Sequence, residues 1–353
     1  MPIAGEIAIL KSIWRKDEKG AWIVHDSQAL KLIPRAGFDA NYFKVKNDVN
    51  LLTSQPGKIF ENVFATFGTT EFLVRQSIVP IVSWHDGDTE ARSIGTGFFI
   101  SASGLLMTAA HVIRDPVDEG HTKLTPMGEK SFKFDESLRF GIILPANPAM
   151  RGAPFLKPHP IQEAKWFLCP FEWIQHWGHT VESPLFTAKP DHKLDLDIAV
   201  CKIQHNIIGG SYQPLNIGPH SLKVGDRAVA IGYAEMKNIP LDGKQEYEPE
   251  LVVSVGSVTQ IYPDNITKKQ STTPGPCFEF NAKIPGKMSG SPIIVGSGVL
   301  TKGVVSRSWQ GENIASGGLI APILGLPLVT GKTLLELIGS GTEGIAKFVG
   351  AGL

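Results

Sequence analysis

The chain has 353 residues, and its 34 Lys and Arg residues balance its 34 Asp and Glu residues, giving a formal net charge of zero. This balance argues against partners such as nucleic acid or an anionic membrane surface, which select a basic protein face. The three cysteines, Cys169, Cys201 and Cys277, are too few for a disulfide framework. No run approaches the roughly 18 apolar residues of a membrane span. We therefore expect a cytoplasmic protein.

Residues 1–70 contain short apolar segments and no group of residues that suggests chemistry. Glu6–Ile13 and Ala21–His25 have the pattern of strands, and Lys58–Phe67 fits a short helix or strand. We interpret this region as an N-terminal extension that packs on the rest of the chain. A module that recognises a partner protein is the alternative.

A β-hairpin is predicted just before His111. Ile78–Trp84 and Ser93–Ile100 read as strands, Ser101–Gly104 as a turn, and Leu105–Thr108 as an apolar strand that leads to Ala109, Ala110 and His111. The small alanines leave room beside the imidazole for a neighbouring side chain. His111 is therefore our candidate general base, with a buried core histidine as the plain alternative.

The next segment, residues 144–191, is rich in proline, tryptophan and histidine. Roughly 85 positions separate His111 from Asp197, more than a few strands and tight turns need, and we interpret residues 144–191 as an inserted surface segment. Cys169, His176 and His179 raise the possibility of a metal site, but their spacing matches no standard zinc pattern. We expect no metal and no organic cofactor. The aromatic residues either line a substrate wall or form a satellite hydrophobic cluster.

A carboxylate opens the alternating segment Leu194–Ile203. Asp197 immediately precedes Ile198, Ala199 and Val200, and a buried carboxylate there can hold an imidazole by its second nitrogen. Asp195 lies two residues away and would share the same face of a strand, so it is a rival.

Further strands are predicted at Leu222–Tyr233, Leu251–Ile261 and Cys277–Ala282, and Ser291–Val295 forms a hairpin with Leu300–Ser306. Between them, Pro285–Pro292 reads PGKMSGSP and places Ser289 in a turn of small residues. Glycines in such a turn allow successive N–H groups to converge on an anion in front of the serine. A serine hydroxyl needs a base to act as a nucleophile, and His111 and Asp197 supply a base and an orienting acid.

The order His111, Asp197, Ser289 and the phrases TAAHV, DIAV and SGSP resemble the chymotrypsin-like (trypsin-like) serine peptidase superfamily over roughly Ser77 to Leu328. The order differs from that of α/β-hydrolases and subtilisins. The HtrA-like bacterial branch looks closest, because the cysteine framework of secreted animal enzymes is missing. We expect no PDZ-like module after the peptidase region, since too few residues remain there.

This resemblance implies an all-β fold of two antiparallel six-stranded barrels at residues 71–328, with the insertion at about 144–191 and a helix and tail at 329–353. It implies a serine endopeptidase acting on proteins or peptides through an acyl-enzyme, with an oxyanion hole formed by the N–H groups of Lys287 and Ser289. It also implies substrate contacts at the pocket-floor position Lys283, which suggests an acidic first-site residue, and on the strand with Val305, Ser306 and Arg307.

The pair Lys287-Met288 departs from the Gly-Asp of secreted trypsin-like enzymes. Without the carboxylate, activation by a newly cut N-terminus is not expected, so the enzyme is either constitutive or switched by a partner protein. A lysine in the hole is strained if the backbone there is left-handed, unless the hole forms only on substrate binding. A catalytically silent chymotrypsin fold that binds peptides or partner proteins is therefore the alternative.

In the tail, Val329–Ile338 reads as a helix in which Leu334, Leu335 and Ile338 form a core-docking face.

Overall fold

The computed structural model describes five short strands within residues 1–46 and, with gaps, residues 77–336. The gaps are residues 102, 115–124, 129–130, 134, 146–165, 178–179, 183–195, 205–211, 213, 216, 219–220, 246, 248, 264–272, 296–299 and 309–312. The predicted segment Lys58–Phe67, the rival Asp195, His179 and Ile338 lie outside the described residues.

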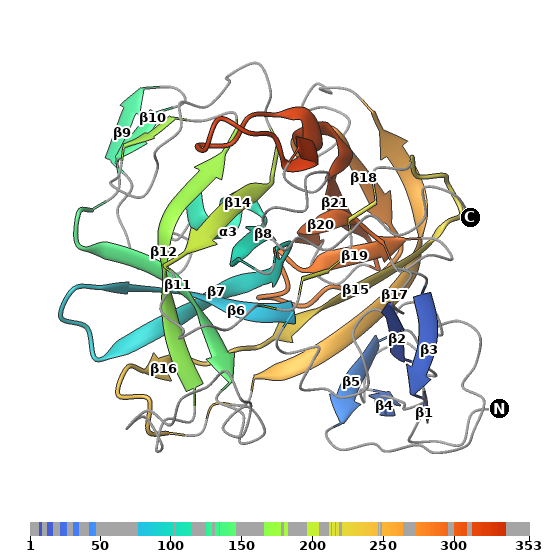
Figure 1. Cartoon of the computed structure of the whole chain (residues 1–353), viewed down its shortest axis with the longest axis horizontal. Coiled ribbons are helices and arrows are strands. Elements are labelled where there is room, and N and C mark those ends of the chain that lie inside the picture. Colours follow the sequence, from blue (N-terminus) through green and yellow to red (C-terminus); the bar gives the residue numbers. More distant parts are fainter. Residues whose placement is uncertain are drawn as a thin grey trace.

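Six antiparallel strands close the first barrel (Figure 1). The sheet runs in the order β7-β6-β11-β12-β14-β8, and β8 pairs back with β7. The predicted hairpin before His111 is confirmed as β7 and β8. The strands are β6 (Ile78–His85), β7 (Glu90–Phe99), β8 (Leu105–Thr108), β11 (Leu138–Pro145), β12 (Trp166–His176) and β14 (Ala199–Ile203).

The second barrel closes in the same way, in the order β17-β15-β19-β20-β21-β18, with β18 paired to β17. Two closed six-stranded antiparallel barrels are the fold class predicted from the sequence. The strands are β15 (Arg227–Ala234), β17 (Glu250–Tyr262), β18 (Cys277–Phe280), β19 (Pro292–Val295), β20 (Thr301–Ser308) and β21 (Ala315–Leu319).

The N-terminal region adds to the second barrel. Strand β5 (Tyr42–Lys46) pairs with β17 at Val252–Ser254, and β4 (Lys31–Pro34) and β1 (Ile7–Ala8) follow it outward. Strands β2 (Ile13–Lys16) and β3 (Trp22–Asp26) form a separate hairpin. Figure 1 shows these strands in blue beside β17.

Short elements complete the fold. Strand β16 (Ile239–Pro240) pairs with β7, and β9 (Thr125–Gly128), β10 (Ser131–Lys133) and β13 (Thr180–Glu182) form a small sheet. Helix α3 (Ala110–Arg114) follows β8, and the 3-10 helix η3 (Ala321–Gly325) follows β21. Among the residues that the structure describes, no helix is long and apolar enough to cross a membrane.

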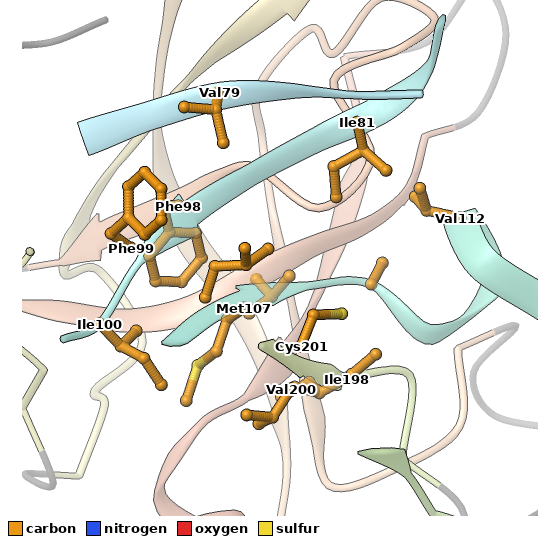
Figure 2. Close-up of a cluster of buried hydrophobic side chains, with 14 of the residues drawn as sticks. Val79, Ile81, Phe98, Phe99, Ile100, Met107, Val112, Ile198, Val200 and Cys201 are labelled. Carbon is orange, nitrogen blue, oxygen red and sulfur yellow. The ribbon is translucent and has the colours of Figure 1, made fainter. Parts of the chain in front are cut away.

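The largest cluster of buried apolar side chains centres on the first barrel and includes Phe98, Phe99 and Met107. Figure 2 shows these side chains together with Val112 of α3 and Ile198 and Val200, which follow Asp197. Because the residues next to His111 and Asp197 are anchored in this core, both catalytic candidates are held at its edge.

Part of the predicted insertion is a barrel strand. Within residues 144–191, β12 (Trp166–His176) pairs with β11 and β14, and Cys169 and Ile174 lie in the core. Trp173 and Trp177 are buried in the same cluster, whereas Trp166 packs with Val82 and Trp84 in a smaller one. These tryptophans are core residues, and the suggested substrate wall does not apply to them.

The predicted C-terminal helix begins later than expected. Residues 329–333 form a turn and an isolated bridge, and helical structure starts at Leu334. Thr333 and Glu336 form a capping box there, since the Thr333 N–H donates to Glu336 Oε2 (2.7 Å) and the Glu336 N–H donates to Thr333 Oγ1 (3.1 Å). Leu334 is buried as predicted, but Leu335 is half exposed and does not belong to a core-docking face.

Burial raises the pKa of the Cys169 thiol to about 12. Because this pKa is raised in the folded protein, the neutral thiol contributes its full stabilisation of the fold below the unfolded pKa of about 8.5. That contribution is lost as the pH rises from there through the folded value. We expect the wild type to lose about 1–2 kcal/mol more stability between pH 7 and pH 10 than Cys169→Val. Urea unfolding of both proteins at the two pH values measures this. Equal losses would show that the thiol ionises equally in both states.

Candidate active site

His111 and Asp197 are in direct contact. His111 Nδ1 lies 2.7 Å from Asp197 Oδ2, and the His111 backbone N–H donates to Asp197 Oδ1 at 2.9 Å. His111 lies in the first turn of α3, and Asp197 precedes β14, the strand that pairs with β8. These two bonds fix the plane of the imidazole, with Nδ1–H donating to the carboxylate and Nε2 left as the acceptor.

Asp197 is ionised at neutral pH, although only 2% of its side chain is exposed. Burial alone would raise the pKa of this carboxyl group. The positive charge that His111 carries when it is protonated, hydrogen bonds from His111 and Ser306, and the charge of Arg114 outweigh burial and hold the pKa below its usual value. The ionised Asp197 carboxylate therefore stabilises the folded protein above the unfolded pKa of about 3.9. This contribution is lost only as the pH falls through the lower folded value.

Ser306 of the second barrel joins this pair. Its buried hydroxyl donates a hydrogen bond to Asp197 Oδ2, which therefore accepts from both barrels. Its carbonyl oxygen accepts from the Ser289 hydroxyl at 3.1 Å. In this structure the Ser289 hydroxyl donates to the Ser306 carbonyl rather than to the imidazole of His111.

The turn that carries Ser289 has a left-handed residue at Lys287, with φ of 73°. The positive φ lies at Lys287 itself, and Gly286 does not take it up. A lysine in this region costs about 1–2 kcal/mol relative to the right-handed helical region. Gly290 also has a positive φ of 88°, and its N–H donates to the Val305 carbonyl at 2.8 Å.

The predicted substrate-binding residues lie on two segments beside this turn. Lys283 is half-buried, and its carbonyl accepts from Ser254 Oγ at 2.6 Å. Val305 is buried, and its N–H donates to the Ser291 carbonyl at 2.8 Å. Arg307 is exposed at the end of β20. Both backbone polar groups of Val305 therefore bond to the turn that carries Ser289, since the Val305 carbonyl accepts from the Gly290 N–H at 2.8 Å.

No group of three or more His, Cys, Asp and Glu side chains with metal-binding geometry occurs among the described residues. Cys169 and His176 are both buried in β12.

A family model described as the trypsin-like peptidase domain matches residues 95–301, more than half of the chain. The chain belongs to this family. The match begins at the glycine-threonine-glycine segment of β7 and ends on β20, so it includes His111, Asp197 and Ser289. A comparison with curated proteins gave no match.

Among solved structures, one similar to this chain is the crystal structure of Deg5, at 18% identity and a TM-score of 0.43, covering 79% of this chain and 93% of that chain. Another is the active form of Rv3671c protease from M. tuberculosis, at 15% identity and a TM-score of 0.39, covering 79% and 87%. The inactive form of the same protease is similar at 14% identity and a TM-score of 0.38, covering 71% of this chain and 87% of that chain. Identities and TM-scores at this level carry no functional information.

The sequence did not point to Ser306 as a partner of the acid. The family resemblance predicts Ser306 at the substrate, and the structure adds a contact of its hydroxyl with Asp197 from the opposite barrel. The sequence offers one indication: Ser306 follows the apolar pair Val304-Val305, so a polar side chain occupies a position where a buried apolar residue is expected. A buried hydroxyl needs a hydrogen-bond partner.

Proposed function

We propose that this member of the trypsin-like peptidase family is a serine endopeptidase that cleaves peptide bonds through an acyl-enzyme. The observation that carries the proposal is the pair of hydrogen bonds from His111 to Asp197, which leaves Nε2 as the acceptor beside the barrel junction where Ser289 lies. A protein or peptide is the substrate, and no metal or organic cofactor takes part.

In this mechanism His111 takes the proton of Ser289, and the serine oxygen attacks the peptide carbonyl. Asp197 orients the imidazole and stabilises its charged form, and the N–H groups of Lys287 and Ser289 stabilise the oxyanion. His111 then gives its proton to the leaving amine. Water attacks the acyl-enzyme with His111 as the base, which restores Ser289.

The Ser289 hydroxyl must leave the Ser306 carbonyl for this to happen. A substrate that pairs with β20 as an added strand presents an N–H to the Ser306 carbonyl and replaces the hydroxyl there. Rotation of χ1 to another staggered position then turns the hydroxyl toward His111. We therefore propose that binding of the peptide backbone couples to activation of the nucleophile.

A catalytically silent, peptide-binding chymotrypsin fold is the second candidate. The hydrogen bond from the Ser289 hydroxyl to Ser306, and the lysine in the left-handed position of the turn, favour it. The proposed peptidase forms an acyl-enzyme, whereas a silent module does not.

A pre-steady-state experiment with a nitrophenyl ester separates the two candidates. The peptidase releases a burst of nitrophenol equal in amount to the enzyme, followed by slower turnover. A steady rate without a burst, at the level of Ser289→Ala, would favour the binding module.

We propose that the first-site pocket prefers an acidic side chain, because Lys283 stands at the pocket-floor position. A charge-assisted hydrogen bond contributes about 1.5–3 kcal/mol, so we expect roughly 10- to 100-fold preference in kcat/KM for glutamate or aspartate over glutamine. Lys283→Glu reverses this preference toward lysine or arginine, and the exposed Lys223→Glu, which changes the net charge equally, does not. A peptide library that is cut after apolar residues by all three proteins would overturn the assignment.

Met288 is buried in the second-barrel cluster of apolar side chains, at the position before the nucleophile. No charge is available at this position for an N-terminal ion pair. We therefore propose that activity does not depend on N-terminal cleavage; an activating partner protein is the remaining route of control.

A further inference from the structure

The left-handed backbone at Lys287 needs support from its surroundings, since the side chain offers none of the freedom of glycine. The turn's own hydrogen bonds are limited: the Met288 N–H reaches the Pro285 carbonyl at 3.4 Å, and the Ser291 N–H donates to the Met288 carbonyl at 3.0 Å. Neither bond involves the carbonyl of Lys287 or that of Ser289. Both of those carbonyls are held from the first barrel.

Thr96 of β7 contacts both carbonyls. Its hydroxyl donates to the Lys287 carbonyl at 3.0 Å, and its backbone N–H donates to the Ser289 carbonyl at 2.8 Å. Thr96 thus binds the two residues whose N–H groups form the proposed oxyanion hole. The preceding Gly95 permits this approach, because a Cβ there would lie 2.6 Å from a methyl group of Val112 and 3.0 Å from the Ser289 carbonyl.

The direction of the Thr96 hydroxyl proton is fixed by its neighbours. The backbone N–H of Tyr233 in β15 donates to Thr96 Oγ1 at 3.1 Å, and an N–H can only donate. The hydroxyl proton is therefore left for the Lys287 carbonyl. Thr108 of β8 donates to the Thr96 carbonyl at 2.8 Å, so that β7, β8, β15 and the turn meet at one fully buried threonine.

We propose that Thr96 is a positioning residue that keeps the oxyanion turn formed before substrate arrives. It fixes the carbonyl ends of Lys287 and Ser289, and the N–H groups of the same two residues then keep their direction toward the oxyanion. The inference rests on the proposed peptidase function. It explains how a turn without an ion pair at Met288 holds a lysine in a left-handed conformation.

The test is the rate at which a fluorophosphonate labels Ser289 in Thr96→Val, followed by mass spectrometry. Valine has nearly the shape of threonine but cannot donate to Lys287 or accept from Tyr233. We expect labelling and kcat to fall by about 10- to 100-fold, less than for complete loss of an oxyanion donor, because the backbone bond to Ser289 remains. The KM for a peptide and the pH dependence set by His111 should stay within about twofold, since neither β20 nor Asp197 is touched.

Two variants complete the design. Thr96→Ser keeps the hydroxyl and should recover the wild-type rate to within about threefold. Thr301→Val is the matched control, since Thr301 is a buried threonine of β20 whose hydroxyl has no hydrogen-bond partner among the described residues. If Thr96→Val does not fold, Thr96→Cys, whose thiol is a weak donor, replaces it with the same expectation.

Labelling of Thr96→Val at the rate of Thr301→Val, with the wild type also labelled, would overturn the inference and leave the peptidase intact. A fall in Thr96→Val that Thr96→Ser does not recover would also overturn it, because the hydroxyl would not be the cause. An unlabelled wild type would instead contradict the proposed function itself.

Discussion

Replacing Asp197 by asparagine should lower kcat/KM about 10⁴-fold at neutral pH. An amide nitrogen in the place of Oδ2 donates to Nδ1 of His111, which forces the ring proton onto Nε2. In that tautomer the imidazole cannot accept the proton of Ser289. Because the side chains have the same shape, the fold should be retained, and steady-state kinetics with circular dichroism on the same sample measures both.

Asp195→Asn is the control for this experiment, since Asp195 was the rival acid in the sequence. Because His111 contacts Asp197 in the structure, we expect the Asp195 variant to stay within about threefold of the wild type. Full activity in Asp197→Asn together with a loss in Asp195→Asn would exchange the two assignments.

Gly290→Ala should disrupt the nucleophile turn. A Cβ at this position would lie 2.0 Å from the Thr96 carbonyl oxygen and 2.1 Å from Thr108 Oγ1, and Gly290 has φ of 88°. Overpacking and left-handed strain together cost roughly 2–5 kcal/mol. Displacement of the oxyanion donors lowers the rate by a further factor of about 10²–10³. Urea unfolding and fluorophosphonate labelling measure the two effects.

Gly225→Ala is a control that separates the cost of left-handed backbone strain from the cost of a steric clash of the added Cβ. Gly225 has φ of 90° on an exposed turn, and no atom lies within 4 Å of a Cβ built there. It should cost about 1–2 kcal/mol and leave the labelling rate unchanged. Equal stability losses in Gly290→Ala and Gly225→Ala would contradict the expected overpacking, because the turn at Gly290 would then accommodate a Cβ with no loss of stability beyond the backbone strain.

The barrel hairpins could be predicted from the sequence because their signals are local. Strand β8 follows Gly104, whose φ of 96° closes the turn, and β19 and β20 are apolar runs separated by glycines. Strand β21 gave no signal, because Ala315–Leu319 contains two glycines and no β-branched residue. It is a strand because β18 and β20 pair with it on both sides.

Strand β12 was mistaken for inserted surface because proline, tryptophan and histidine interrupt its pattern. It is a strand of a closed barrel whose buried positions are filled by tryptophans and Cys169 rather than by aliphatic residues alone. After the second barrel, the leucine spacing that follows Val329 predicts a helix from that residue. The helix begins at Leu334, because Thr333 caps its N-terminus.

The three catalytic candidates could be found from motif and order, whereas their supporting contacts could not. The bond from Ser306 to Asp197 joins residues 109 positions apart on different barrels, and that from Thr96 to Lys287 spans 191. No periodicity or spacing encodes such pairs. In the sequence, these contacts are indicated by a serine and a threonine within the mostly buried strands β20 and β7.

The proposed peptidase activity depends on Ser289 acting as a nucleophile that His111 activates. Mass spectrometry of the wild type, Ser289→Ala and His111→Ala after exposure to a fluorophosphonate tests it most directly. We expect a single adduct on the Ser289 peptide of the wild type and none at that peptide in either variant on the same timescale. An unmodified wild type, or a His111→Ala protein labelled as fast as the wild type, would contradict it.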